Sequence, residues 1–296
     1  MPADPVGDQS EPQAPHVTSE PGAPDEPRIG ELSEGEVLRR ILQRLGEASS
    51  ALVGPGDDAA VIAAPDGRVV VTTDTLVHGP DFRLAWSSPF DIGWKAAAVN
   101  LADVAAMGAR PTGLVVALAV PTHLPVSFVE GLADGLRAAC DALSPGCTVV
   151  GGDLTSSDTL TIAVTAFGSL DGVEPVLRSG ARPGDLLAIA GTLGSAARGL
   201  EVLFERGVDA AGQPIPLDTA ALSKADADAL AIQLRPAPPL AAGIAAAHAG
   251  ATSMMDVSDG LALDASRIAA MSGVTIDIDT GTLGPNARWA VGGGED

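Results

Sequence analysis

The sequence of 296 residues is short of positive charge, thiols and imidazoles. It contains no tyrosine, two cysteines, four histidines and 17 lysines and arginines against 38 aspartates and glutamates. Because the formal net charge is −21 and the basic residues form no cluster, we exclude a nucleic-acid surface and an anionic membrane surface. Cys140 and Cys147 make no disulfide framework or zinc site, and the histidines are scattered.

The start of the sequence also lacks a basic segment followed by an apolar one, which a signal peptide would require. No apolar run approaches membrane-spanning length without interruption by glycine, proline or charge. We therefore expect a cytoplasmic protein whose partners are small molecules, with no nucleic acid and no membrane among them.

The hydrophobic content of 46% comes mainly from alanine, valine and leucine, and 35 glycines accompany it. The length favours about two domains. Residues 1–29 mix proline with acidic residues, so we predict a disordered tail there. Glycine, proline and charge gather again at 169–185, which divides the rest into an N-terminal domain, 30–169, and a C-terminal domain, 170–296.

Helical and strand patterns alternate in both halves, which predicts an α/β or α+β fold. The expected helices cover 34–45, 89–107, 127–143, 195–206, 237–248 and 260–271. The expected strands cover 68–73, 114–120, 147–150 and 159–167 in the first domain, and 186–190, 253–256 and 274–278 in the second.

Aspartates recur in five segments: GDDA at 56–59, TTDT at 72–75, NLAD at 100–103, GGD at 151–153 and DVSDG at 256–260. A carboxylate near apolar sequence is costly unless it is paired or binds a cation. Asp259 is also well placed to cap the helix that follows it, whereas Asp103 lies inside an apolar helix. Five such segments, with little lysine to pair them, favour Mg²⁺ over five independent caps.

Glycine pairs at Gly54/Gly56 and Gly151/Gly152 form predicted turns whose backbone amides can approach phosphates. The chain has two lysines, Lys95 and Lys224, and neither lies in a glycine loop, so a P-loop is excluded. No glycine fingerprint of a dinucleotide-binding site follows a predicted strand. Arg178 lies where the first domain meets the second. It either bridges the two structurally or neutralises a phosphate.

Seven motifs occur in one order along the chain: GDDAA at 56–60, TTDTL at 72–76, GWKAAAVNLADVAAMGARP at 93–111, VGGDLT at 150–155, LRSGARPGD at 177–185, DVSDGLALD at 256–264 and GGGED at 292–296. In this combination the chain resembles thiamine-monophosphate kinase, a family of the aminoimidazole ribonucleotide synthetase-like superfamily. The resemblance implies phosphorylation of thiamine phosphate by ATP with several Mg²⁺ ions. It also implies a two-domain fold and a homodimer formed through the N-terminal sheet.

The resemblance also implies roles for individual residues. The magnesium shell would comprise Asp58, Thr72, Thr73, Asp74, Asp103, Asp153 and Asp256, with Asp259 at a further magnesium. ATP would contact Gly152, Asp153, Arg178 and Ser258. Thiamine phosphate would contact Glu295, and Asp81 stands where the family usually has a histidine before phenylalanine.

The family continues past the GGED motif, so we expect the C-terminal domain of this chain to lack its last elements. Two alternatives to the kinase stay open. One is another ATP-using enzyme of the superfamily, although a selenophosphate synthetase would need a reactive cysteine near a lysine in the N-terminal region. The other is an inactive homologue that binds nucleotide or metal without turnover.

Overall fold

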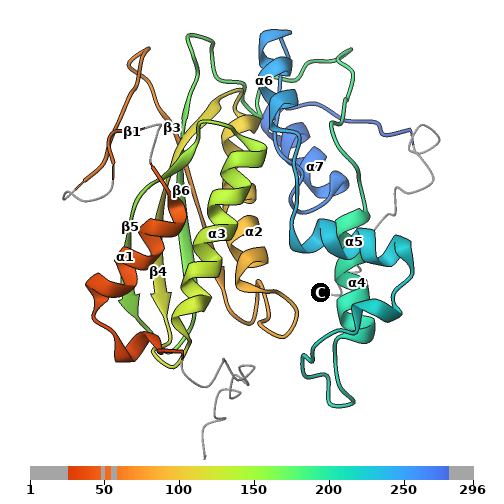
Figure 1. Ribbon diagram of the computed structural model, residues 1–296. Coiled ribbons are helices and arrows are strands. Elements are labelled where there is room, and N and C mark those ends of the chain that lie inside the picture. The colour runs from red at the N-terminus through yellow and green to blue at the C-terminus, as the bar shows by residue number, and fades with distance from the viewer. Residues whose placement is uncertain (1–25, 48–50, 55–58, 280–296) are drawn as a thin grey trace, which may run out of the picture.

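The computed structural model describes residues 26–47, 51–54 and 59–279 (Figure 1). Asp58 and Glu295 lie outside these residues, as does most of the predicted tail. Within the described residues the fold is mixed α/β, with two sheets and three α-helices in the first half and four α-helices in the second (Figure 1). No helix among the described residues is long and apolar enough to span a membrane.

The central sheet has four strands in the order β3-β6-β4-β5. Their bounds are β3 (Val70–Val77), β4 (Arg110–Val120), β5 (Thr148–Ser156) and β6 (Thr161–Ser169). β6 runs antiparallel to both β3 and β4, and β4 and β5 are parallel. Parallel neighbours need a crossover connection, and α3 (Val126–Leu143) supplies it. A separate two-stranded sheet pairs β1 (Ala51–Val53) with β2 (Val61–Ile62).

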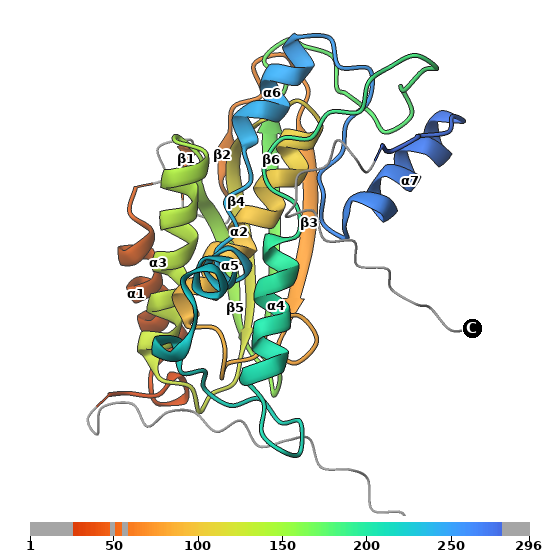
Figure 2. The ribbon, with the colours of Figure 1, turned by 90° about the vertical axis from the view of Figure 1, so that its right-hand side faces the viewer.

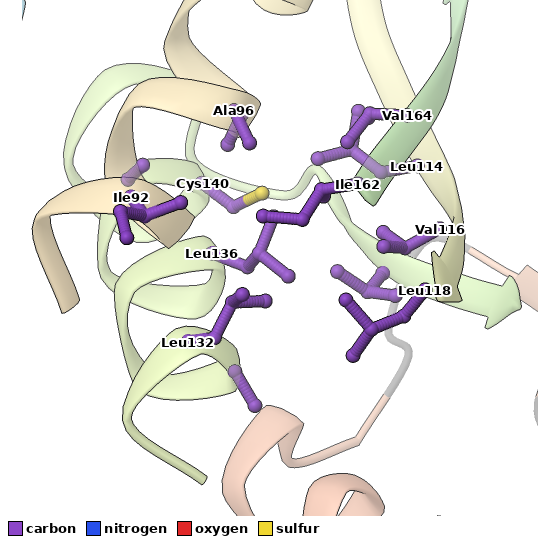
Figure 3. Packing of buried hydrophobic residues seen from close by; sticks show 14 of the residues in the cluster. Ile92, Ala96, Leu114, Val116, Leu118, Leu132, Leu136, Cys140, Ile162 and Val164 are labelled. Carbon is purple, nitrogen blue, oxygen red and sulfur yellow. The ribbon is translucent and has the colours of Figure 1, made fainter. Parts of the chain in front are cut away.

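Helices α1 (Glu34–Leu45), α2 (Pro89–Ala106) and α3 lie over one face of this sheet (Figure 1). Capping boxes begin α1 at Ser33 and α2 at Ser88, each satisfying amides that a helix start leaves free. The core lies between α2, α3 and the sheet, where Leu132 and Leu136 face Leu114 and Ile162 (Figure 3). The predicted helix 34–45 is confirmed, and the other two predicted helices are confirmed within a residue.

The second half contains α4 (Ser195–Arg206), α5 (Lys224–Leu234), α6 (Leu240–His248) and α7 (Leu261–Ser272), with α7 apart from α4 and α5 (Figure 2). Two short 3-10 helices occur at Ile29–Glu31 and Thr219–Ala221. The predicted strands 186–190, 253–256 and 274–278 are wrong, because none of these segments pairs in a sheet. A strand is stable only when neighbours take its backbone hydrogen bonds, and Leu186 is 94% exposed.

Two tryptophans near α2 join the halves of the chain. The indole N–H of Trp86 donates to the carbonyl of Gly207 at 2.6 Å, and that of Trp94 donates to the carbonyl of Pro236 at 2.7 Å. Asp91 pairs with Arg235 at 3.2 Å. The start of α2 is therefore fastened to the ends of α4 and α5.

Candidate active site

Strand β3 presents polar side chains to the C-terminal half of α2. Because side chains alternate along a strand, Thr72 and Asp74 point to the same, helix-covered face. The Thr72 hydroxyl donates to Oδ2 of Asp103 at 3.0 Å, and the Asp74 backbone N–H donates to Oδ1 of Asn100 at 3.1 Å. Asn100 is 1% exposed and its amide nitrogen donates to the Ala96 carbonyl. Strand and helix are thus held together by side chains one helical turn apart.

A segment from the second half of the chain packs against the C-terminal end of α2. The Val176 N–H donates to the carbonyl of Met107, just beyond α2, at 3.1 Å. The Met254 N–H donates to the carbonyl of Leu177 at 3.3 Å. Arg178 therefore lies between the end of α2 and the segment that leads to Asp256, two regions about 150 residues apart in the sequence.

The Asp103 carboxyl lies in an environment that disfavours its charge. Burial raises its pKa from 3.8 to about 6, the negative charges of Asp256 and Asp74 add to the rise, and Arg178 opposes it. Asp103 also lies in the last turn of α2, which has no basic residue, so the negative end of the helix dipole faces it. Such a carboxylate gains most from a nearby cation.

The pKa of Asp256 is raised as well, first by burial and then by the negative charge of Asp264. Arg178 again opposes the shift, and Asp74 adds to it. Four segments distant in sequence therefore contribute to one electrostatic cluster, which we call the aspartate cluster: Asp74, Asp103, Asp256 and Arg178.

The aspartate cluster offers only oxygen ligands to a metal, which suits Mg²⁺ rather than zinc. Within the described residues, no three acidic, histidine or cysteine side chains converge closely enough to hold one ion at once. Asp256 and Asp74 nevertheless raise the pKa of Asp103, and a divalent cation offsets repulsion of that kind. The donor set therefore fits magnesium in its chemistry.

The loop from Asp256 to Gly260 is organised by a buried carboxylate in α7. Oδ2 of Asp264 accepts the backbone N–H groups of Ser258 at 3.1 Å and Asp259 at 3.0 Å. Asp259 does not cap α7, whose N-cap is Gly260 without a side-chain bond; its carboxylate pairs with Arg267 at 2.7 Å. Among the described residues no group is hydrogen-bonded to the Ser258 hydroxyl, which leaves it available to a ligand.

Gly152 and Asp153 lie inside β5, so the predicted turn at the second glycine pair is wrong. The strand needs glycine here because a Cβ on Gly152 would lie 2.2 Å from the Val116 carbonyl oxygen. The strand register aligns Gly152 with Asp74 across the sheet, so both lie on the same face. Three strand spacings separate the two residues, a distance of about 14 Å. Asp153 is one residue further and therefore faces the opposite side of the sheet from Asp74.

Thr73 and Asp81 also lie away from the aspartate cluster. Thr73 points to the opposite face from Asp74, and its hydroxyl donates to the Val164 carbonyl at 3.0 Å. Asp81 lies beyond the end of β3, and Oδ2 accepts the Val77 N–H at 2.7 Å, closing the turn there. The strand rise puts Val77 about 10 Å from Asp74.

The family described as AIR synthase related protein, N-terminal domain, matches residues 56–170. Over 289 residues the chain is 40% identical to a thiamine-monophosphate kinase of Mycobacterium tuberculosis, which covers 93% of this chain and 81% of that protein. The chain belongs to the thiamine-monophosphate kinase family. A member from Corynebacterium glutamicum is 42% identical over 292 residues, covering 92% of this chain and 82% of that protein.

Solved structures of thiamine-monophosphate kinases resemble the chain as well. The crystal structure of the enzyme from Stenotrophomonas maltophilia K279a superposes with a TM-score of 0.67 at 37% identity, covering 82% of this chain and 73% of that one. A second structure, AaThiL complexed with AMPPCP and TMP, has a TM-score of 0.62 at 30% identity and covers 83% and 72%. The mixed α/β fold predicted from the sequence is confirmed.

Two residues to which sequence reasoning assigned no role support the candidate active site. Asn100 supports the Asp74 backbone, and Asp264 supports the loop that carries Ser258. The sequence spacing could have identified Asn100, because this residue precedes Asp103 by about one helical turn and therefore shares its helix face. Asp264 has no such signal, since only the folded loop brings the amides to its carboxylate.

Proposed function

We infer that this chain catalyses the ATP-dependent phosphorylation of thiamine phosphate to thiamine diphosphate. Family membership supports the reaction, and a relative binds AMPPCP, an analogue of ATP, together with TMP. The observation that carries the proposal within this chain is the raised pKa of Asp103 among Asp256 and Asp74. A carboxylate in that field suits a site whose ligands are cations and phosphates.

The chemistry asks little of a protein nucleophile. Phosphoryl transfer depends on in-line positioning and on offsetting the charge of two anionic substrates. Magnesium, when bound, supplies that charge compensation. Asp74, Asp103 and Asp256 would share several Mg²⁺ ions among them, with Asp58 and Asp259 completing the shell. Arg178 would pair with a phosphate of ATP.

Two further contacts complete the proposed site. The Ser258 hydroxyl would bind ATP. Glu295 and Asp81 would contact thiamine phosphate, as the family resemblance implies. We therefore propose direct transfer from ATP to the acceptor phosphate without a phospho-enzyme. A protein that carried radioactivity from γ-labelled ATP through acid precipitation would contradict this step.

The activity test is direct. The chain is mixed with thiamine phosphate, ATP and Mg²⁺, and thiamine diphosphate is separated by chromatography. We expect product with the unchanged chain and at least about a hundredfold less with Asp103→Asn, a loss in the range that removal of one charge-stabilising group produces. The absence of product from the unchanged chain would refute the proposed reaction. A cytoplasmic location accords with it, because ATP is abundant there.

We also propose that the N-terminal domain, 30–169, forms a homodimer through the face of the sheet that α2 and α3 leave uncovered. Val71 points to this face and is 57% exposed. Asp153 and Gly152 lie at the same sheet, Asp153 on the uncovered face. Asp153 would thus act at the subunit interface rather than beside Asp74. The C-terminal domain, 170–296, would lie outside this contact.

The dimer has its own test. Val71→Glu places a charge in the uncovered face, and we expect sedimentation to give a monomer mass. Leu200→Glu, at a partly exposed position on α4 (39%), serves as the matched control and should leave the dimer intact. A monomeric unchanged chain, or a Val71→Glu variant that remains dimeric, would contradict the proposal.

A further inference from the structure

The carboxylate of Asp264 is the most deeply buried charge among the described residues. Its side chain is 2% exposed, and each of its oxygens has a defined partner. Oδ1 accepts from the Arg267 guanidinium at 2.7 Å, while Oδ2 accepts the two backbone N–H groups of Ser258 and Asp259. A buried carboxylate is retained at little cost only when its hydrogen-bonding capacity is filled in this way.

The two amide bonds do not cap the helix that carries Asp264. Asp264 belongs to the first turn of α7, yet the helix start at Gly260 has no side-chain cap. The two amides come instead from the loop between Asp256 and Gly260, which lies outside the helix. Arg267 bridges Asp264 and Asp259, holding the latter at 2.7 Å. The network thus connects the buried carboxylate to two successive residues of the loop, Ser258 and Asp259.

We propose that Asp264, with Arg267 as its counter-ion, is the positioning residue of the Asp256–Gly260 loop and determines how that loop presents Ser258 and Asp259 to ATP and magnesium. The inference rests on the proposed function for the identity of the ligands. Asp264 touches neither ligand in this scheme, because both of its oxygens are already bonded. It acts through the backbone of the residues that do.

The bonding pattern specifies what each substitution removes. Asp264→Asn keeps one carbonyl oxygen for an amide, but it turns an NH₂ group toward donors and leaves Arg267 without its buried partner. Arg267→Gln leaves the two amide bonds in place and removes the bridge to Asp259. Arg267→Lys keeps a positive charge but replaces the planar guanidinium whose Nη1 contacts both carboxylates. The three variants therefore distinguish the effect of the amide hydrogen bonds on the loop conformation from the effect of the Arg267 charge.

The first measurement is amide hydrogen exchange at Ser258 and Asp259 by NMR, without nucleotide or metal. In Asp264→Asn we expect both amides to exchange at least about tenfold faster than in the unchanged chain, since a hydrogen bond to a charged group is lost. Arg267→Gln should alter Asp259 more than Ser258. Asp228→Asn removes an exposed carboxylate on α5 and serves as the matched control with unchanged exchange.

The second measurement is binding of ATP with Mg²⁺ by calorimetry, together with the Mg²⁺ dependence of turnover. Asp264→Asn should weaken binding and raise the Mg²⁺ concentration at half-maximal rate by at least about tenfold, while KM for thiamine phosphate stays within about twofold. Arg267→Lys should recover part of what Arg267→Gln loses. If Asp264→Asn fails to fold by circular dichroism, the two Arg267 variants carry the test.

Protection of both amides in a folded Asp264→Asn variant would overturn the inference, as would Mg²⁺ dependence equal to that of Asp228→Asn. Failure of the proposed function has a different signature. In that case the unchanged chain forms no thiamine diphosphate, while the exchange of the Ser258 and Asp259 amides still responds to Asp264→Asn.

Discussion

Replacing Asp103 by asparagine should make the metal-free protein more stable while it lowers activity at least about a hundredfold. Burial and two neighbouring carboxylates raise the Asp103 pKa from 3.8 to about 6. A group whose pKa is raised on folding contributes stability that is fully present below pH 3.8 and is lost as pH rises through about 6. Since one pKa unit corresponds to about 1.4 kcal/mol, the ionised carboxylate costs the folded state about 3 kcal/mol at neutral pH.

Asparagine keeps the shape of the side chain and an oxygen that accepts from the Thr72 hydroxyl, so little else should change. We therefore expect Asp103→Asn to raise the free energy of unfolding by about 1 to 3 kcal/mol at pH 7 and by nearly nothing below pH 4. The assay is urea unfolding followed by circular dichroism at intervals from pH 3.5 to pH 8, with a chelator present throughout.

Asp228→Asn removes the same charge from an exposed position, where it pairs with Lys224 at 2.6 Å. An exposed pair contributes little, so this control should change the free energy of unfolding by less than about 1 kcal/mol at every pH. The reasoning would be refuted by an Asp103→Asn variant no more stable than the unchanged chain at pH 7. A stabilisation that does not depend on pH would refute it too.

Three further predictions concern the metal, one glycine and the thiols. Mg²⁺ with ATP should raise the melting temperature of the unchanged chain, and Asp103→Asn should lose most of that rise; equal rises would separate Asp103 from the metal. Gly152→Ala should lower the free energy of unfolding by about 1 to 3 kcal/mol in urea, because its Cβ would lie 2.2 Å from a backbone oxygen of β4. Gly151→Ala, with its Cβ 3.9 Å from the nearest atom, is the tolerated control, and equal effects would contradict the close approach. Both cysteines are buried, and the contact with Cys147 and burial raise the pKa of the Cys140 thiol. A thiol reagent should therefore label neither Cys140 nor Cys147 until the protein is unfolded, and rapid native labelling would show otherwise.

Helices with a clear apolar face and a cap were predictable from local pattern. The helix 34–45 has its capping box at Ser33 and a continuous apolar stripe, and it forms with the predicted bounds. α5 was missed although Ser223 caps it through the Asp226 amide, because alanines give its sequence little contrast between faces. The strands predicted after Ser169 failed because their stability depends on partners that local pattern does not reveal.

The candidate site divides in the same way. The spacing of Thr72 and Asp74 places both on one face of a strand, and Asn100 and Asp103 share one face of a helix. The spacing of residues in the sequence, however, does not reveal which face of the sheet carries Asp153, because the register of all four strands determines this face. The predicted turn at Gly151 and Gly152 failed for the same reason, since the close approach to β4 exists only in the sheet.

The types of group available follow from the amino-acid sequence alone: carboxylates in glycine-flanked and apolar segments, a scarcity of lysine, and motifs in the order of one family. These are properties of neighbouring residues and of their succession along the chain. The tertiary structure sets which carboxylates share an electrostatic field, because Asp74, Asp103 and Asp256 come from segments far apart in sequence. It also determines that Asp264 holds two amides of the loop before it, since burial and hydrogen-bond partners arise when the chain packs.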